Sequence, residues 1–281
     1  MNDLNKKIKF AIRLMQQAAA MAEKVGQPLE ICYSGGKDSD VILTLAEMAG
    51  VAFKGVYKCT GIDPRGTISH AKERGCVVLP PKKRFRQCIV EHGLPSRFRR
   101  HCCGELKEYK VYDYAVVGVR RDESTKRAAR YKEPEICRVY NKNEKSRQYL
   151  PILEWSAEDI AEFIAAEGIK CHPLYYDECG KFHVERRLGC IGCPLKSKKK
   201  RIEDFMMHPN YIKLYTSGAE QFLATHPNSK QHRNFRNAYE WFVMSLFADN
   251  MVEFRNRFGT NLFEAGTDCK QFLEDYFKIT L

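Results

Sequence analysis

A glycine-containing loop is the first segment whose residues could do chemistry. Residues 34–39, SGGKDS, follow the apolar run LEICY and precede the helix-like run VILTLAEMAG. Glycines Gly35 and Gly36 let the backbone approach an anion closely, and a following helix supplies free amide groups. Ser34, Ser39 and Lys37 add hydroxyl and ammonium donors. The glycine-to-lysine spacing differs from that of the GxxxxGK[ST] loop, so we predict a phosphate cradle of another kind.

Two cysteine pairs form a second candidate site. Cys102 and Cys103 are adjacent, and Cys190 and Cys193 form a CxxC motif. In a reducing compartment clustered cysteines favour a metal or redox role, and four thiolates suffice for one zinc ion or one [4Fe-4S] cluster. Adjacent residues rarely both point at a small ion, which favours the larger cluster, but zinc and no metal remain open. The scattered cysteines are expected in the core: Cys32, Cys59, Cys76, Cys88 and Cys137.

Two further loops could contact the same anion. Residues 59–67, CTGIDPRGT, could close over a base or ribose, and residues 118–128, GVRRDESTKRA, present guanidinium groups suited to phosphate or sulfate. For each loop alone, a charged surface loop is an equal alternative. The nucleotide-binding residues predicted in these loops are Thr60, Gly61, Gly118, Arg120, Arg121 and Ser124.

Strands and helices alternate along the first half of the chain. We expect a helix at 5–24, a strand at 29–33, a helix at 39–48, a strand at 51–59, a helix and a third strand within 66–80, and a strand at 114–119. This alternation predicts an α/β fold, a doubly wound and mainly parallel sheet with helices on both faces. Ligands bind beyond the carboxyl ends of such strands, where the glycine loop falls.

The second half is helical in pattern. Residues 156–169 begin with a helix start signal, and from Ile202 onward only helical periods occur, with Trp241, Phe242, Met244 and Leu246 as expected packing residues. We therefore predict a nucleotide-binding domain with the cysteines over residues 1–200 and a helical C-terminal extension over 201–281. No linker marks the boundary.

Composition restricts the function classes. The 281 residues are 44% hydrophobic, but no apolar run approaches the roughly 18 residues of a spanning helix and the N-terminus lacks a signal peptide's apolar stretch, so we expect a cytoplasmic protein. The net charge of +12 favours polyanionic partners, nucleotides and also DNA or RNA. Basic runs are more often solvated surface, so this evidence is weak alone.

The ordered motifs resemble a known family. SGGKDS after a strand is similar to the PP-loop of the ATP pyrophosphatase superfamily, whose members cleave ATP between the α and β phosphates. With the CC pair, the RRDES segment, PILEW and GCIGCP, residues from about 29 to 200 resemble the phosphoadenosine phosphosulfate (PAPS) reductase family. The resemblance implies that residues 34–39 bind an adenine nucleotide, that Asp38 can reach magnesium, and that Lys37 and Arg120 act on the phosphates. It also implies that the four paired cysteines bind a [4Fe-4S] cluster.

The chain departs from the reductases of that family in one respect. Their nucleophilic cysteine lies in a C-terminal ECGxH segment, whereas here the tail holds only Cys269, followed by lysine and glutamine, so its thiolate is not obviously activated. The ECGKFH segment at residues 178–183 contains Cys179 and His183 but lies in the middle of the chain. We predict a turn at Gly180 there, and a structural role for Cys171 and His172.

Three functions remain open from the sequence. The favoured one is ATP pyrophosphatase-type activation for sulfur transfer to, or modification of, a nucleic acid, with a sulfur or thiol donor protein as partner. The alternative is a sulfonucleotide reductase that converts adenylylsulfate (APS) or PAPS to sulfite, with Cys269 as nucleophile. The third is a non-catalytic nucleotide-binding subunit of a nucleic-acid-processing complex. The net charge and the missing tail favour the first, and the oligomeric state is not indicated.

Overall fold

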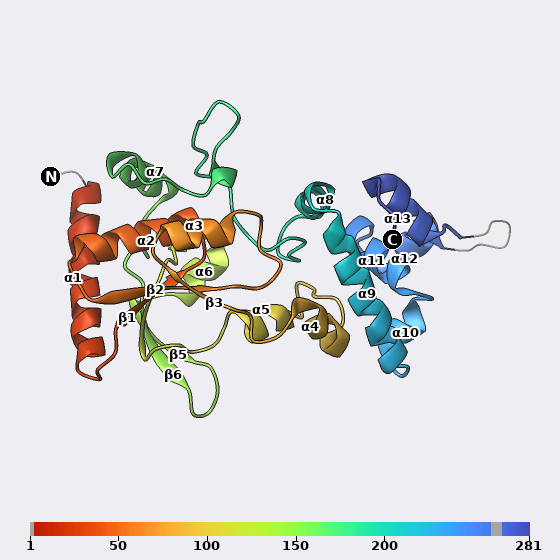
Figure 1. Ribbon diagram of the computed structural model, residues 1–281, viewed down its shortest axis with the longest axis horizontal. Helices are drawn as coiled ribbons and strands as arrows, with labels where there is room; N and C mark the ends of the chain where they lie inside the picture. The colour runs from red at the N-terminus through yellow and green to blue at the C-terminus, as the bar shows by residue number, and fades with distance from the viewer. Residues whose placement is uncertain (1–2, 260–265) are drawn as a thin grey trace. The chain divides into compact units, whose positions relative to one another are not determined.

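The computed structural model describes residues 3–259 and 266–281, in two compact units (Figure 1). Unit 1 is formed by residues 1–59, 63–81 and 108–189, and unit 2 by residues 60–62, 82–107 and 190–281. This division differs from the predicted boundary at residue 200, because three segments before that residue belong to the helical unit. In the described residues no helix has the length and apolar character needed to cross a membrane.

A six-stranded sheet is the centre of unit 1. Its strands lie in the order β3-β2-β1-β4-β6-β5, and every neighbouring pair is parallel except β5 with β6. The predicted α/β class with a mainly parallel sheet is confirmed, and β1 has the predicted bounds. The strands are β1 Leu29–Tyr33, β2 Phe53–Lys58, β3 Val77–Leu79, β4 Tyr114–Val117, β5 Glu135–Val139 and β6 Lys145–Tyr149.

The hairpin of β5 and β6 was not predicted from the sequence. Three of the five residues of β5, EICRV, are apolar, but exposed and half-buried positions alternate along it, so it has no fully buried apolar face. The turn is closed by Asn141, whose side-chain oxygen accepts from the amides of Asn143 and Glu144, both at 2.9 Å. Asparagine in such a turn was the available signal. Cys137 lies exposed on β5, so the expectation that it is a core residue is wrong.

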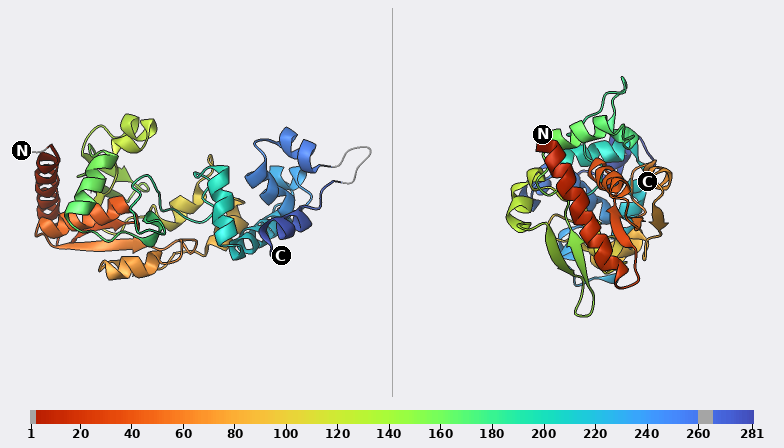
Figure 2. Two further views of the ribbon diagram at one scale, coloured as in Figure 1. Left: turned by 90° about the horizontal axis from the view of Figure 1, so that it is seen from above. Right: turned by 90° about the vertical axis from the view of Figure 1, so that its left-hand side faces the viewer.

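Helices cover the sheet of unit 1 with apolar faces. Ala11 and Met15 of α1, Ile42 of α2 and Phe163 of α7 are fully buried in one hydrophobic cluster with the sheet, and α1 is seen along its side in Figure 2. The helix α2 begins two residues earlier than predicted. The helices are α1 Asp3–Glu23, α2 Lys37–Met48, α3 Thr67–Glu73, α6 Thr125–Arg130 and α7 Ala157–Ala166, with 3₁₀ turns at Arg121–Glu123 and Pro173–Tyr175.

Unit 2 is built from helices around an aromatic core, with Phe205, Tyr215 and Phe242 at its centre. The predicted packing residues Trp241, Phe242 and Leu246 are buried, while Met244 is half-buried. The helices are α4 Phe85–His92, α5 His101–Leu106, α8 Lys198–Met207, α9 Asn210–Thr225, α10 Lys230–Asn234, α11 Ala238–Phe247, α12 Met251–Phe258 and α13 Cys269–Phe277.

Helix α4 joins unit 2 through close packing on α9. A Cβ atom placed on Gly218 would lie 3.0 Å from the Cβ of Ile89, so the two helices approach closely where α9 has no side chain. Arg86 donates from Nε to Ser217 Oγ at 3.1 Å and from Nη1 to Gln221 Oε1 at 2.8 Å. These contacts explain why residues 82–107 belong with the C-terminal helices.

Replacing Phe163 by alanine tests the core of unit 1. Phe163 is fully buried, with its ring centroid 5.3 Å from that of Trp155. We expect Phe163→Ala to lower the free energy of unfolding in a denaturant titration by about 3–5 kcal/mol. Phe10→Ala, on a side chain that is 48% exposed, should change it by less than about 0.5 kcal/mol. Equal losses in both variants would contradict this core.

Candidate functional site

The glycine loop connects the end of β1 to the start of α2 in unit 1. Ser39 Oγ donates to the carbonyl of Gly36 at 2.6 Å, and Ser34 Oγ lies 3.3 Å from Ser39 Oγ. The first amides of a helix have no acceptor within the helix, and its N-terminus carries positive partial charge. The loop and the first turn of α2 therefore offer backbone and hydroxyl donors to an anion.

Two glycines, one in the loop and one after β4, leave room for neighbouring segments of the chain to touch the cradle. Gly35 has φ of +77°, and a Cβ atom on it would lie 2.6 Å from Cγ2 of Thr67, the first residue of α3. A Cβ atom on Gly118, after β4, would lie 3.0 Å from the carbonyl oxygen of Asp38. The absence of side chains at these positions lets α3 and the β4 loop close on the cradle.

Three charged side chains meet at the cradle. Lys37 is 3% exposed and its Nζ lies 3.1 Å from Asp38 Oδ2. Arg120 Nε donates to Asp38 Oδ1 at 2.6 Å, and Arg120 Nη1 donates to Asp122 at 3.0 Å and to the carbonyl of Trp155 at 3.3 Å. The structure thus brings together the predicted residues Lys37, Asp38 and Arg120, with Asp38 between the two cations.

Arg121 and Ser124 are bonded within their own segment. Arg121 donates to the carbonyls of Tyr131 and Lys132 and forms an ion pair with Glu154. Ser124 caps α6, because its Oγ accepts from the amide of Arg127 at 3.2 Å. These bonds hold the loop after β4, and nucleotide contact by either side chain stays a prediction.

Tyr175 supports the cradle and was missed in the sequence. It is 2% exposed, its hydroxyl accepts from the amide of Leu188 at 3.3 Å, and Lys37 Nζ lies 5.5 Å from its ring centroid. Burial raises the pKa of Tyr175 to about 12, so the hydroxyl stays protonated at neutral pH. Tyr175 lies well over 100 residues after the loop in the sequence, so no local pattern indicates that it contacts the loop.

Behind the loop, a buried polar group joins α2 to α3. The Tyr33 hydroxyl donates to Asp40 Oδ1 at 2.5 Å, and His70 Nε2 lies 3.2 Å from both Asp40 oxygens. The ring of His172, 1% exposed, lies 5.8 Å from that of His70, centroid to centroid. Burial, together with the neighbouring His70, lowers the pKa of His172. Through Asp40, His70 holds α3, and with it Thr67, near Gly35.

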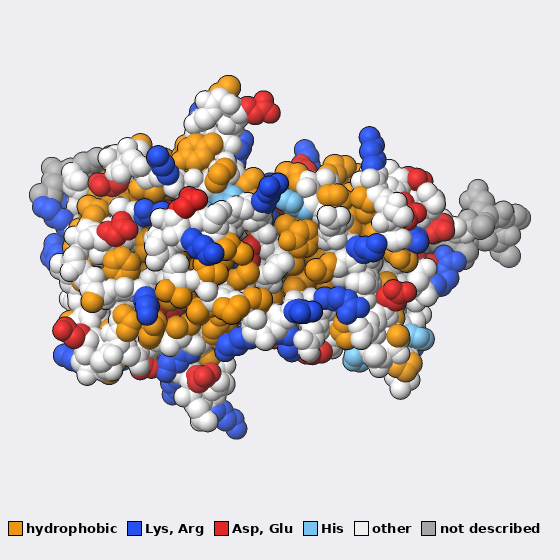
Figure 3. Space-filling model, in the orientation of Figure 1, with side chains coloured by type: hydrophobic (Ala, Val, Ile, Leu, Met, Phe, Trp, Pro, Cys, Tyr) orange, Lys and Arg blue, Asp and Glu red, His pale blue; other side chains and the backbone are white. Residues whose placement is uncertain are grey.

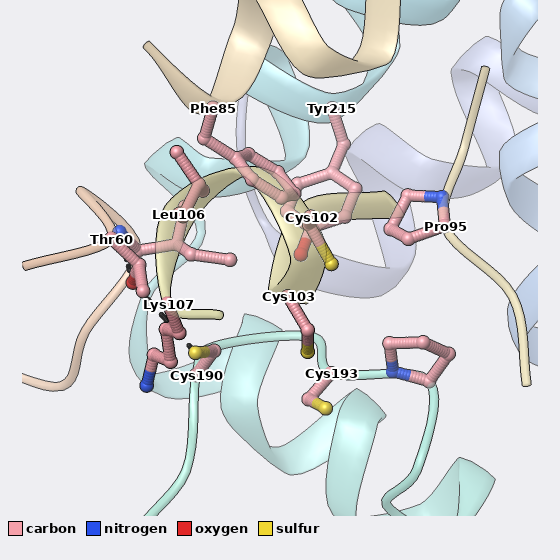
Figure 4. Close-up of a pocket in the computed structure, with 12 residues that line it drawn as sticks. Thr60, Phe85, Pro95, Cys102, Cys103, Leu106, Lys107, Cys190, Cys193 and Tyr215 are labelled. Atoms are coloured by element: carbon pink, nitrogen blue, oxygen red, sulfur yellow. Dashed lines mark hydrogen bonds between the residues drawn. The ribbon is translucent and has the colours of Figure 1, made fainter. Parts of the chain in front are cut away.

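The four paired cysteines line one cavity of unit 2. Cys102 and Cys103 come from α5, and Cys190 and Cys193 from the loop before α8, with Phe85, Leu106 and Tyr215 forming an apolar wall (Figure 4). The cavity is also lined by Thr60, Ile62, Pro95, Lys107 and Pro194. The chain therefore brings together two pairs that are separated by more than 80 residues in sequence.

The spacing of the thiols distinguishes the possible metals. Four thiolates around one zinc ion lie about 3.8 Å apart, given a Zn–S bond of about 2.3 Å. Within the described part of the chain no three cysteine sulfurs lie within 4.8 Å of one another. One group of donors in the described residues does lie that close together, formed by Glu91, His92 and Glu105. Both of its carboxylates already pair with Lys83, whose Nζ lies 2.5 Å from Glu91 and 2.7 Å from Glu105. The described cysteine sulfurs are therefore not gathered as the ligands of a single zinc ion would be.

The cysteine cavity favours a thiolate. A hydrogen bond from the Cys102 thiol lowers the pKa of Cys103 to about 6, with Arg100 and Lys107 acting in the same direction, while pairing with Cys103 and burial raise the pKa of Cys102. Burial raises the pKa of Cys193. The thiol–thiol hydrogen bond and the two basic side chains therefore favour the ionised form of Cys103.

Thr60 lies in the wall of this cavity and not in unit 1. Its side chain is 2% exposed, and Oγ1 lies 3.7 Å from Cys190 Sγ. The amide of Ile191 donates to the carbonyl of Ile62 at 2.8 Å, which joins the segment to the CxxC loop. Gly61 is exposed with φ of +76° and open space around it. Nucleotide binding by Thr60 and Gly61 stays a prediction.

Comparison with known families decides the assignment. Residues 28–196, more than half of the chain, match the phosphoadenosine phosphosulfate reductase domain. The chain belongs to this family. The matched region contains both the glycine loop and all four paired cysteines.

Relatives within the family carry different activities. The chain is 29% identical to a sulfate adenylyltransferase subunit 2 of Rhizobium etli, covering 63% of this chain and 64% of the relative. It is 23% identical to an adenosine 5′-phosphosulfate reductase of Streptomyces coelicolor, over 64% of this chain and 86% of the relative. Three uncharacterised relatives are matched over only 37–53% of their length. A structure of PAPS reductase from Candida auris in complex with phosphate is 13% identical to this chain, with a TM-score of 0.42. The match covers 68% of this chain and 96% of that structure.

The cysteines considered as nucleophiles occupy different settings in this family member. Cys269, at the start of α13 in unit 2, is 3% exposed, and burial raises its pKa to about 12. Cys179 is exposed in a hairpin closed by the Tyr176–Phe182 bridge, where Gly180 has φ of +78° in the turn. His183 there lies 2.9 Å from Asp177 and 2.9 Å from Glu185. Cys269 is therefore buried with a raised pKa, while Cys179 lies on an exposed hairpin of unit 1.

The buried His172 predicts a dependence of stability on pH. Its pKa is lowered in the folded protein, so its contribution to stability is present above the unfolded value of about 6.5 and is lost as the pH falls below it. In His172→Asn, the asparagine oxygen can replace Nδ1, which accepts from the Leu174 amide at 3.2 Å. Between pH 7.5 and 5.5 we expect the free energy of unfolding to fall less in this variant than in the wild type. The difference between the two slopes should be at most about 1.4 kcal/mol per pH unit, the value for one proton. His232→Asn, on the surface, is the control, and equal pH dependence of His172→Asn and the wild type would contradict the prediction.

Proposed function

We propose that the chain binds ATP in the loop at residues 34–39 and transfers its adenylyl group to an acceptor, releasing pyrophosphate. The single observation that carries this proposal is the cradle itself, where Lys37, Asp38 and Arg120 meet beside the free amides of α2. Membership of the family supports an adenine nucleotide as ligand. The R. etli relative is named for an adenylyl transfer, which supports ATP in particular.

The proposed reaction forms one bond and breaks one bond at the α-phosphorus. A lone pair of an acceptor oxygen attacks the α-phosphorus, and the bond from this phosphorus to the bridging oxygen breaks. The bonding electrons leave with pyrophosphate, and any proton on the acceptor oxygen passes to solvent. Lys37 and Arg120 neutralise the charge that develops on the phosphates, while Asp38 orients both cations. Asp38 can also bind the magnesium ion of Mg-ATP, which proteins hold through few carboxylates plus phosphate oxygens.

A second step would then consume the adenylated acceptor. A sulfur nucleophile attacks the activated carbon, and AMP leaves with the C–O bonding electrons, so that sulfur replaces oxygen. This step needs a sulfur or thiol donor protein. Reduction of a sulfonucleotide to sulfite is the alternative, because the S. coelicolor relative is named as such a reductase. The buried Cys269 with its raised pKa disfavours that alternative, since it is poorly placed to act as the nucleophile.

Replacing Lys37 tests the adenylyl transfer. We expect Lys37→Ala to lower pyrophosphate release from Mg-ATP on the order of 10²- to 10³-fold, because a charge that stabilises the transition state is lost. Lys126→Ala removes an exposed lysine of α6 and should leave the rate unchanged. Both variants should unfold at the denaturant concentration of the wild type within small differences. Undiminished pyrophosphate release in Lys37→Ala would overturn the assignment.

We also propose that Cys102, Cys103, Cys190 and Cys193 hold a [4Fe-4S] cluster. Four cysteines that line one apolar cavity, with no three of their described sulfurs within 4.8 Å of one another, support this group. Arg100 and Lys107 add positive charge that offsets the tetrathiolate. When bound, the cluster supplies electron-transfer or sulfur-binding chemistry, and the four residues hold it in an apolar cavity.

Iron analysis after anaerobic purification tests the cluster. We expect about four iron and four sulfide ions per chain in the wild type, the stoichiometry of a [4Fe-4S] centre. Cys190→Ala should lose most of the iron, because one of the four thiolates is removed. Cys179→Ala, on an exposed cysteine of unit 1, should retain it. A colourless wild-type protein with one zinc ion per chain would contradict the cluster.

A further inference from the structure

Phe98 stands out among the apolar side chains of the described residues because it is 99% exposed. It lies in unit 2, on the loop between α4 and α5, four residues before Cys102. An exposed phenylalanine carries a cost in hydration free energy that no contact within its unit offsets. Single exposed apolar residues are common, so the exposure of Phe98 indicates a binding role only together with the residues around it.

The loop holds Phe98 at the tip of a closed turn. The amide of Ser96 donates to the carbonyl of Arg99 at 3.1 Å, and the amide of Arg99 donates to Ser96 Oγ at 3.1 Å. Arg97 Nε donates to the carbonyl of Pro194 at 3.2 Å, which fixes the turn to the segment between the CxxC motif and α8. The phenyl ring is therefore presented by a bonded turn, and less backbone entropy is lost when it binds.

The two chain segments that meet at this turn are rich in positive charge. Residues 82–107 and 190–201 contain 13 Lys and Arg but only two Asp and Glu. Some of these cations are paired within unit 2, as Lys196 is with Asp204 and Lys198 with Asp249. Arg99, next to Phe98, and Lys199 and Lys200 at the start of α8 are exposed. Lys and Arg side chains are visible over α4 and α5 on the face drawn in Figure 3.

An aromatic ring flanked by arginines matches the chemistry of one ligand class. Bases of a single strand stack on exposed aromatic rings, and arginine and lysine contact the phosphates that link them. A duplex hides the faces of its bases, so it cannot use the ring in this way. A purely acidic chain such as poly-glutamate would use the cations but offers no ring on which Phe98 could stack.

We propose that unit 2 binds single-stranded nucleic acid, with a base stacked on Phe98 and phosphates bound by Arg99, Lys199 and Lys200. This inference rests on the proposed function, for which it names the acceptor class. DNA and RNA share the chemistry that recognises Phe98 and the cations. The experiment therefore includes both.

Fluorescence anisotropy with labelled twelve-nucleotide dT and rU strands, at low salt and without ATP, tests the proposal. We expect Phe98→Ala to weaken binding of at least one strand about tenfold, within the range measured for base stacking on aromatic residues, and Phe98→Trp to retain it. Arg99→Ala should lower the slope of log Kd against log salt by about 0.7, the value for one phosphate contact on a single strand. Met207→Ala removes a 60% exposed apolar side chain of α8 and is the matched control.

Several results would overturn the proposal. These are no binding of either strand, equal affinity of Phe98→Ala and the wild type, a duplex that binds as tightly as the single strands, or poly-glutamate that competes as well as the oligonucleotides. Because the assay contains no ATP, its result is independent of adenylyl transfer. A protein that binds the strands but releases no pyrophosphate contradicts the proposed function alone. A protein that releases pyrophosphate with another acceptor and binds no strand contradicts this inference alone.

Discussion

The close approach of three chain segments at the glycine loop is the constraint on which unit 1 depends. Thr67 packs where Gly35 has no side chain, and Gly118 passes against the carbonyl of Asp38. The cradle is therefore shaped by the segments after β1, β2 and β4, which pair in one parallel sheet. Its donors are held before any ligand arrives, so little ordering entropy is lost when an anion binds. The ion pairs of Asp38 and the bond between Asp40 and His70 hold the same segments from the sides.

A comparable constraint operates in unit 2, through helix packing and not through a sheet. Helix α4 fits against Gly218 of α9, and α5 with its cysteine pair follows α4 in the chain. The CxxC loop is fixed by Arg201, which donates to the carbonyl of Gly192 at 3.3 Å and to that of Ser245 at 2.6 Å. One member of the basic run at the start of α8 is thus a buried structural residue, while its neighbours Lys199 and Lys200 are exposed.

The parts of the fold that could be predicted are those with a local physical signal. The bounds of β1 follow from a short apolar run that ends at a glycine loop, and α7 follows from Ser156 and Asp159, which form a capping box. Helix α4 carries apolar residues at Phe85, Cys88 and Ile89, the spacing of a helix face, but the basic residues around them concealed it. Tyr175 and Thr60 could not be placed, because their positions depend on contacts between segments far apart in the sequence.

The order of segments along the chain has a consequence for how the cysteine cavity forms. Unit 2 draws on residues 60–62 and 82–107 and then on nothing until residue 190. During synthesis, at roughly 5–20 residues per second, the whole second half of unit 1 emerges after Cys102 and Cys103 and before Cys190. Cys102, Cys103 and the apolar face of α4 therefore stay without their packing partner α9 for several seconds, until α9 has been synthesised. The apolar wall of the cavity can close only after Tyr215 of α9 has been made, so any group bound by all four cysteines enters after both units have been largely synthesised.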